Sequence, residues 1–292
     1  MAHPTSVDRL DLGDHVCWTF DDDDRRLAAM ARFVTAALER DHRVIYYLAA
    51  ESEPALLAGL RGRGVPVAAA TGSGQLRVRP AEELFGGGLD PQAAVDRLGR
   101  AVDEALADGY RGARIVTDLA WAAAAGVELE LLIRYEELLN PLFAGDHAVG
   151  VCLYDRRRFP ACDLHRIGTA HPGTTWAEDD SVWEPLLRMH RTGDPPRLRL
   201  VGELDLSNRR AVPPVLTAMR APDPATPGRP PLVIDASELT FADVSFAGLL
   251  LQTARIAPAG LQIRGCRPAV ARTLECVGAS EVPGIAVTEA PA

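Results

Sequence analysis

The chain has 292 residues, a length that favours two domains, and its 47% hydrophobic and 24% charged residues are typical of a folded globular protein. All 31 basic side chains are arginine, and the formal net charge is −9. The lack of lysine excludes a P-loop nucleotide site, a protein kinase and Schiff-base chemistry, since each needs a lysine amine, and the negative charge argues against nucleic-acid binding.

The first half of the chain alternates strand and helix patterns. Continuous apolar runs, typical of strands buried in a parallel sheet, predict strands at 15–20, 43–49, 75–78, 113–118 and 148–154. Amphipathic patterns predict helices at 21–40, 53–62, 91–108 and 129–143. The acidic run Asp21–Asp24 suits the start of the first helix, because carboxylates complement the dipole at a helix N-terminus. Strands separated by helices predict an α/β fold with a doubly wound, mostly parallel sheet.

Proline and glycine interrupt this pattern between about 168 and 196, where we expect an interdomain connection with a short helix at 182–190. The alternation then restarts, with strands expected at 197–202, 232–235 and 261–265 and helices at 207–219, 245–257 and 268–277. The sequence therefore predicts a smaller second α/β domain. The expected boundaries are 8–170 for the first domain, 171–195 for the connection and 196–290 for the second domain.

The cysteines and the apolar segments bear on location. Five scattered cysteines without a C-x-x-C pair are expected to be free thiols of a reducing compartment. No apolar run approaches the ~20 residues of a membrane span, and the first residues lack the apolar core of a secretion signal. We therefore expect a cytoplasmic protein.

Three segments of the second half carry a family resemblance. Residues 235–245 (DASELTFADVS) pass from a strand into a helix, and serine at that position is a common helix N-cap. Together with 199–206 (RLVGELDL) and 268–282 (PAVARTLECVGASEV), this segment resembles the STAS family of anti-sigma-factor antagonists. The resemblance implies a small α/β domain that binds an anti-sigma factor, a serine kinase with a histidine-kinase-like ATPase fold.

The same resemblance implies a site at the helix start. It places the phospho-acceptor at Ser245 and the partner-binding residues at Ser207, Asp243, Ser245 and Phe246. The usual D-S-S-G-L motif of the family reads D-V-S-F-A in this chain, so that Phe246 replaces glycine. Two interpretations of Ser245 therefore stay open, a phosphorylation switch and a simple N-cap.

The first half also carries a resemblance. Its opening Gly13–Trp18 (GDHVCW) places His15 and Cys17 on the same side of a strand, where both can reach one ligand. With 114–121 (RIVTDLAW) and 151–159 (VCLYDRRRF), this opening resembles the MEDS sensory domain. The resemblance implies a degenerate RecA/KaiC-like fold without a nucleotide site, and sensing of a small organic molecule.

Candidate ligand-binding residues follow from strand polarity. Ligands of open parallel sheets bind beyond the carboxyl ends of the strands. That rule, with His15 added for its place beside Cys17, selects eight residues: His15, Cys17, Phe20, Glu51, Asp118, Trp121, Tyr154 and Arg156.

Enzyme and metal signatures are weak. The chain has no G-x-S-x-G or H-E-x-x-H motif, and the pairs Glu82/Glu83 and Glu136/Glu137 resemble solvated helix faces. We therefore expect no catalytic residue, no metal site and no cofactor beyond an organic ligand.

The sequence thus predicts a ligand-sensing anti-sigma-factor antagonist that regulates transcription through protein–protein binding. The oligomeric state stays open. The alternatives are a constitutive protein-interaction scaffold without a ligand and a metal- or haem-binding sensor that uses His15 and Cys17.

Overall fold

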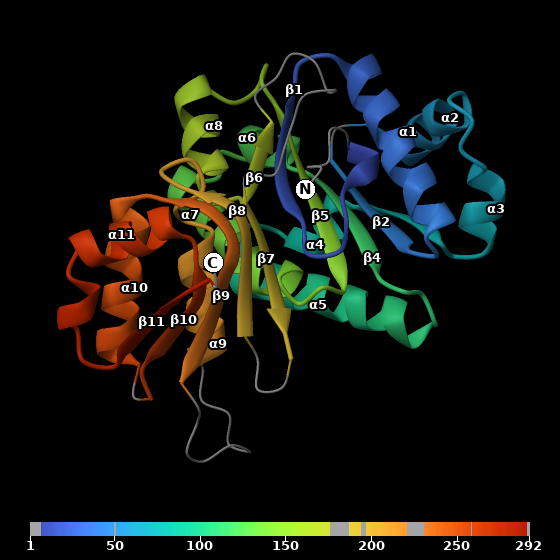
Figure 1. Cartoon of the computed structure of the whole chain (residues 1–292). Helices are drawn as coiled ribbons and strands as arrows, with labels where there is room; N and C mark the ends of the chain where they lie inside the picture. The colour runs from blue at the N-terminus through green and yellow to red at the C-terminus, as the bar shows by residue number, and fades with distance from the viewer. Residues whose placement is uncertain are drawn as a thin grey trace. The chain divides into compact units, whose positions relative to one another are not determined.

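A computed structural model describes residues 7–49, 51–175, 187–193, 197–220, 231–257 and 259–290. The chain divides into two compact units, Met1–Pro185 and Leu186–Ala292 (Figure 1). Among the described residues, no helix is long and apolar enough to cross a membrane. The expected boundaries of 8–170, 171–195 and 196–290 stay a prediction, although strands occur in part of the expected connection.

A six-stranded sheet forms the centre of the first unit. Its strands are β1 (His15–Phe20), β2 (Arg43–Leu48), β3 (Leu76–Pro80), β4 (Ala113–Asp118), β5 (Ala148–Asp155) and β6 (Gly173–Thr175). They run in the order β3-β2-β4-β5-β1-β6, and every pairing is parallel. Strands β1, β2, β4 and β5 are buried along their whole length, as their continuous apolar runs predict.

Helices cover both faces of this sheet (Figure 1). One face packs against α1 (Asp23–Glu39), α2 (Glu53–Arg61) and α3 (Val67–Gly72). The other face packs against five helices: α4 (Ala81–Phe85), α5 (Pro91–Ala107), α6 (Ala120–Ala124), α7 (Leu129–Phe143) and α8 (Ala161–Gly168). A short 3-10 helix, Val7–Arg9, precedes β1. The predicted doubly wound parallel sheet is confirmed.

The start of α1 shows how a polar sequence fixes a helix end. Asp22 is the N-cap, and its Oδ1 accepts hydrogen bonds from the backbone N–H of Asp24 at 2.8 Å and of Arg25 at 3.0 Å. Asp23 and Asp24 then lie in the first turn, where the helix dipole favours negative charge.

The second unit contains a mixed five-stranded sheet. Its strands are β7 (Leu187–Thr192), β8 (Arg197–Leu204), β9 (Leu232–Ala242), β10 (Leu261–Cys266) and β11 (Ile285–Glu289), in the order β11-β10-β9-β8-β7. Only the β7–β8 pairing is antiparallel. The helices are α9 (Val212–Arg220), α10 (Val244–Ile256) and α11 (Pro268–Cys276), with a 3-10 turn at Ala279–Glu281. The predicted smaller C-terminal α/β domain is confirmed.

Three local predictions in this unit are wrong. The described part of the expected helix at 182–190, residues 187–190, belongs to β7 because it pairs with β8; residues 182–186 lie outside the described residues. The helix expected at 207–219 begins at Val212, after a turn. Strand β9 continues through 236–242, beyond its expected end at residue 235, because these residues pair with β8.

Candidate functional site

Four buried polar side chains meet on the face of the first sheet that α7 covers. We call His15, Glu136, Cys152 and His171 the buried cluster; one ligand atom of each lies within 4.8 Å of those of the other three. The residues come from β1, α7, β5 and the segment between α8 and β6. All four are at most 2% exposed, so the cluster is closed to bulk water.

Oxygen Oε2 of Glu136 is the centre of the cluster. It lies 3.4 Å from His15 Nε2 and 3.2 Å from His171 Nε2. Cys152 Sγ lies 3.2 Å from the same oxygen and 3.4 Å from His15 Nε2. One carboxylate oxygen therefore faces two imidazoles and a thiol.

Hydrogen bonds from neighbouring groups hold the cluster in place. Asn140, one turn after Glu136 on α7, lies with its Oδ1 3.0 Å from His15 Nδ1, and its Nδ2 donates to the carbonyl of Ala170 at 2.8 Å. The hydroxyl of Tyr154 donates to Glu136 Oε1, the carboxylate oxygen that faces away from the histidines. These hydrogen bonds fix the backbone of Ala170, the residue before His171, and the orientation of the Glu136 carboxylate.

Burial and charge set the protonation of these groups. Burial opposes ionisation of Glu136, but the charge and the hydrogen bonds of His171 and His15 in their protonated forms outweigh it and hold the carboxyl pKa well below its usual range. Burial, followed by the nearby His171, lowers the pKa of His15. Burial and the charge of Glu136 raise the pKa of the Cys152 thiol well above its usual value. The cluster by itself therefore contains an anionic carboxylate, from Glu136, and a protonated thiol, from Cys152.

Three of the eight predicted ligand-binding residues lie at the buried cluster. His15 belongs to it, and the Tyr154 hydroxyl reaches it through Glu136. Cys17 is fully buried and lies directly opposite Cys152 in the β1–β5 register. These side chains point into the core rather than to a solvent-facing pocket.

Three others lie at the rim of the sheet, where two form ion pairs and one makes a cation–π contact. Glu51 accepts from Arg26 at 2.7 Å, and Arg156 pairs with Asp21. The ring of Phe20 lies 5.5 Å from the guanidinium of Arg26. These contacts tie the N-terminal end of α1 to the strand ends.

The last two lie at the end of β4. Asp118 is buried, and its Oδ1 accepts from the backbone N–H of Ala120 at 2.9 Å. Trp121 packs on Phe85 with ring centroids 4.5 Å apart, and its buried Nε1 has no hydrogen-bond partner. The eight residues are therefore distributed over three places and do not line one cavity.

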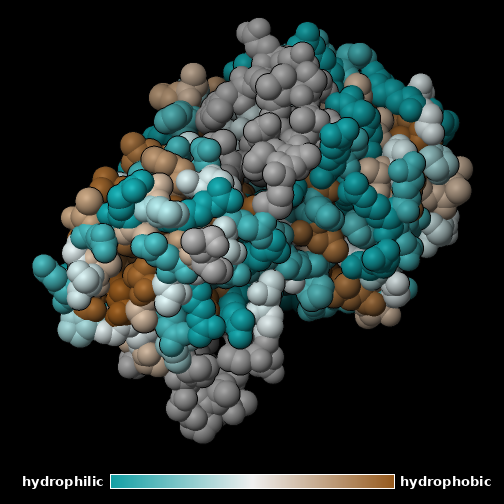
Figure 2. All heavy atoms as spheres, in the orientation of Figure 1, coloured by the Kyte–Doolittle hydropathy of each residue, from teal (hydrophilic) through white to brown (hydrophobic). Residues whose placement is uncertain are grey.

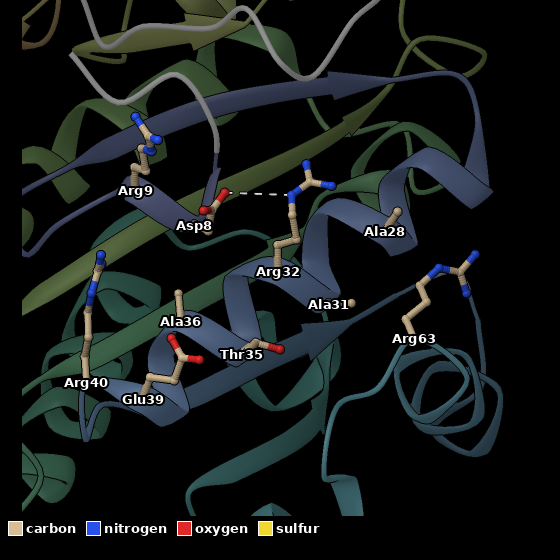
Figure 3. Close-up of a pocket in the computed structure, with 10 residues that line it drawn as sticks. All are labelled: Asp8, Arg9, Ala28, Ala31, Arg32, Thr35, Ala36, Glu39, Arg40 and Arg63. Atoms are coloured by element: carbon tan, nitrogen blue, oxygen red, sulfur yellow. Dashed lines mark ion pairs between the residues drawn. The ribbon is translucent and has the colours of Figure 1, made fainter. Parts of the chain in front are cut away.

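Within the described part of the chain, a cavity of about 560 Å³ lies away from these eight residues, on the outer side of α1 (Figure 3). An ion pair between Asp8 and Arg32, 3.7 Å apart, lies at its edge. Its lining is rich in arginine and alanine: Asp8, Arg9, Ala28, Ala31, Arg32, Thr35, Ala36, Glu39, Arg40 and Arg63. None of the predicted ligand-binding residues is among them.

Sequence reasoning misplaced Glu136 and missed Cys152 and His171. Glu136 was expected on a solvated helix face, but its side chain is completely buried. Its spacing from Leu132, Leu139 and Phe143 matches the apolar stripe of α7, and that periodicity was the available signal.

The partner-binding residues predicted in the second unit lie at the carboxyl edge of its sheet. The backbone N–H of Asp243 donates to the carbonyl of Leu204 at 3.1 Å, which joins the ends of β8 and β9. Ser207 donates through its hydroxyl to Asp205 Oδ1 at 2.6 Å. Asp243 rather than Ser245 is the N-cap of α10, because its Oδ1 accepts from the backbone N–H of Phe246 at 2.9 Å.

Ser245 and Phe246 differ in burial. Ser245 is exposed in the first turn of α10, whereas Phe246 is only 3% exposed. Phe246 is thus a core residue of the second unit, and its contact with a partner stays a prediction.

Exposed apolar side chains lie at the same edge of the sheet as Ser245. Leu206, Phe241 and Val244 are 57%, 47% and 62% exposed, and all three flank the joined ends of β8 and β9. Figure 2 also shows hydrophobic surface over the region of α10 and α11. We call Leu206, Ser207, Phe241, Val244 and Ser245 the edge surface.

Family models match both halves of the chain. Residues 14–172 match the MEDS model, described as "MEthanogen/methylotroph, DcmR Sensory domain". The chain belongs to the MEDS family. Residues 187–286 match a STAS domain model, described as "Mlab, STAS domain", so the MEDS domain is followed by a STAS domain.

The other comparisons are distant. The structure of a KaiC-like protein from Pyrococcus horikoshii is similar to this chain, with 12% sequence identity and a TM-score of 0.42. The match covers 65% of this chain and 78% of the KaiC-like protein. A search of curated proteins found no match. The MEDS and STAS matches therefore carry the family assignment, and they join a sensory domain to an anti-sigma-antagonist-like domain in one signalling chain.

Proposed function

We propose that the chain is an anti-sigma-factor antagonist whose STAS domain binds an anti-sigma factor of the histidine-kinase-like ATPase fold. Binding would sequester the anti-sigma factor and release its sigma factor, so that transcription responds without DNA contact by this chain. The MEDS domain would set the affinity of this binding. No catalytic step by this chain is part of the proposal.

The edge surface carries the proposal. Protein interfaces are built around exposed apolar side chains with polar groups at the rim, and Leu206, Phe241 and Val244 beside Ser207 and Ser245 fit that pattern. The hydrogen bonds of Asp205 and Asp243 fix the segments that follow β8 and β9 before a partner binds, which limits the entropy lost on binding.

Phosphorylation of Ser245 would switch this surface. Its side chain is exposed beside Val244, at the N-terminus of α10. A phosphate there adds a charge of about −1.5 to −2 among apolar contacts and next to the Asp243 carboxylate. Phosphorylation would therefore weaken partner binding, while the unmodified serine would permit it.

The MEDS domain would act through a small organic ligand at the carboxyl ends of its strands. The unpartnered indole N–H of Trp121, three residues after Asp118 at the end of β4, supports this place, because a buried donor gains free energy when a ligand accepts from it. A ligand changes partner affinity only if it binds two arrangements of the chain unequally. A bound ligand is revealed by comparing the native mass and the denatured mass of one preparation. Equal affinity of the ligand-loaded and the ligand-free protein for the partner would contradict regulation by the MEDS domain.

Capture of the partner tests the proposed function. The tagged full chain is incubated with an extract of its source cells, and retained proteins are identified by mass spectrometry. Val244 and Ile256 offer a matched pair, since they lie near opposite ends of α10 and are 62% and 61% exposed. We expect an ATPase of the named class with the unmodified chain and with Ile256→Asp, and its loss with Val244→Asp. Equal capture by all three proteins, or capture of no such ATPase, would contradict the proposal.

A further inference from the structure

The buried cluster has too many acceptors for its donors. The Nδ1 of His171 lies 3.1 Å from the carbonyl oxygen of Ile167, which can only accept, so Nδ1 carries the proton. In His15, Nδ1 faces Asn140 Oδ1, because the Asn140 amide donates to Ala170. In their neutral forms both histidines therefore turn a bare Nε2 toward Glu136 Oε2, itself an acceptor.

This arrangement leaves a place for a cation. The Nε2 of His171 is buried and has no hydrogen-bond partner, although Glu136 Oε2 is only 3.2 Å away. Within the cluster, the Cys152 thiol is the one group that donates to that oxygen. Two lone pairs and a carboxylate that converge in the core need a positive charge between them.

We propose that His15, Glu136, Cys152 and His171 bind one divalent transition-metal ion of the zinc class. Imidazole, thiolate and carboxylate are the ligands that zinc takes in proteins. Bonds of 2.0–2.3 Å in a tetrahedron place the ligand atoms about 3.3–3.6 Å from one another. Four of the six distances in the cluster are 3.2–3.4 Å, so little movement is needed.

The charges balance. On binding, the Cys152 thiol loses its proton to solvent and becomes a thiolate. The thiolate and the Glu136 carboxylate then carry two negative charges, the two imidazoles are neutral, and a divalent ion makes the site neutral. A neutral site is the least costly to bury in this core, where all four residues are at most 2% exposed.

The surrounding groups match the outer shell of known metal sites. A ligating histidine usually donates its other N–H to a carbonyl or amide, as His15 and His171 do to Asn140 and Ile167. The Tyr154 hydroxyl holds the second oxygen of Glu136 and leaves Oε2 for the metal. Four protein ligands leave no open position for substrate, so the site is structural or regulatory rather than catalytic.

Haem does not suit this site. The ligand atoms lie within 4.8 Å of one another, and Phe143 stacks on His15 with ring centroids 4.7 Å apart. A macrocycle has no space between side chains this close. The metal site also uses Cys152 rather than Cys17.

Cobalt substitution of the full chain tests the site. The chain is stripped with a chelator and titrated with Co²⁺ alone. We expect saturation at about one ion per chain, with the d–d bands of tetrahedral cobalt and a thiolate charge-transfer band. Zn²⁺ added afterwards should displace the cobalt and bleach both bands. A wild-type chain that gives no bands, or only octahedral bands, would overturn the proposal.

Cysteine variants provide the matched control. Cys17 and Cys152 are both buried and lie opposite each other in neighbouring strands. Cys152→Ser should lose the charge-transfer band, whereas Cys17→Ser should keep it. Equal loss in both, or retention in Cys152→Ser, would overturn the ligand set.

A measurement on the wild-type chain avoids dependence on variants that fail to fold. X-ray absorption at the zinc edge of the reloaded protein should give about one sulfur and three nitrogen or oxygen neighbours. A shell without sulfur would overturn the proposal. None of these measurements involves the anti-sigma partner, so the two proposals fail independently.

Discussion

His171 Nε2 lies 3.2 Å from Glu136 Oε2, although the histidine follows α8 and the glutamate lies in the middle of α7. Both side chains are completely buried. The contact joins α7 to the segment that leads into β6, the edge strand that pairs with β1. The buried cluster thus fixes the end of the MEDS domain to its sheet.

Glu136→Gln should destabilise the chain strongly. Glu136 is the buried carboxylate that faces both imidazoles and would bind the proposed metal ion. Removing one charge of such a buried charged pair typically costs about 3–5 kcal/mol of unfolding free energy, because the remaining groups lose their partner without regaining water. Urea unfolding measures the loss. The control is Glu137→Gln on the same helix, whose carboxylate pairs with Arg134 at 3.4 Å near the surface and should change stability by less than about 1 kcal/mol. Equal effects of the two substitutions would contradict the central place of Glu136.

Gly150→Ala should disturb the support of His15. A Cβ at Gly150 would lie 2.3 Å from the ring of Phe143, the ring that stacks on His15. We expect a loss of about 1–3 kcal/mol from overpacking. Gly99 in α5 has nothing within 4 Å of such a Cβ, so Gly99→Ala should instead stabilise the chain by about 0.5–1 kcal/mol. Thermal unfolding distinguishes the opposite signs.

Stability should fall on acidification below about pH 6.5, the pKa of an unperturbed histidine. Burial, with the neighbouring Arg114, lowers the pKa of His42 to about 4. Between these values the unfolded chain binds a proton at His42 and the folded chain does not, so protonation favours unfolding. The urea midpoint of His42→Gln should therefore depend less on pH in this window than that of the wild type. The exposed His147 is the control, and an equal flattening by His147→Gln would refute the assignment.

Ser245→Glu should weaken binding of the anti-sigma partner by about tenfold or more, since a charge placed among apolar contacts must be desolvated. Ser245→Ala should bind as the wild type does. Ser280 is also exposed but lies in the 3-10 turn after α11, so Ser280→Glu should leave the affinity unchanged. Calorimetric titration separates these cases. Weaker binding by Ser280→Glu as well would indicate a general charge effect instead of a switch at Ser245.

Sequence patterns correctly predicted those helices and strands whose hydrophobic pattern lies entirely within their own residues. Strand β4 (Ala113–Asp118) and helix α7 (Leu129–Phe143) have the predicted bounds, because one is a continuous apolar run and the other has a regular apolar stripe. Strand β9 was predicted too short, because its second half is defined by pairing with β8.

The site was harder to predict for the same reason. His15 and Cys17 do share a face of β1, but the residues that complete the buried cluster come from three other parts of the chain. Only the fold brings them together. Charge also misled the prediction at Glu136, since a carboxylate on an apolar stripe is normally exposed unless it has a partner. At α10 two residues suited to capping, Asp243 and Ser245, lie close together, and sequence alone did not choose between them.

The proposed function requires that the edge surface binds the anti-sigma factor. Hydrogen–deuterium exchange of the full chain, alone and with the captured ATPase, tests it most directly. We expect slower exchange in peptides that cover residues 203–208 and 241–246, which include Leu206, Phe241 and Val244. Protection confined to other parts of the chain, with these two segments unchanged in a saturated complex, would contradict it.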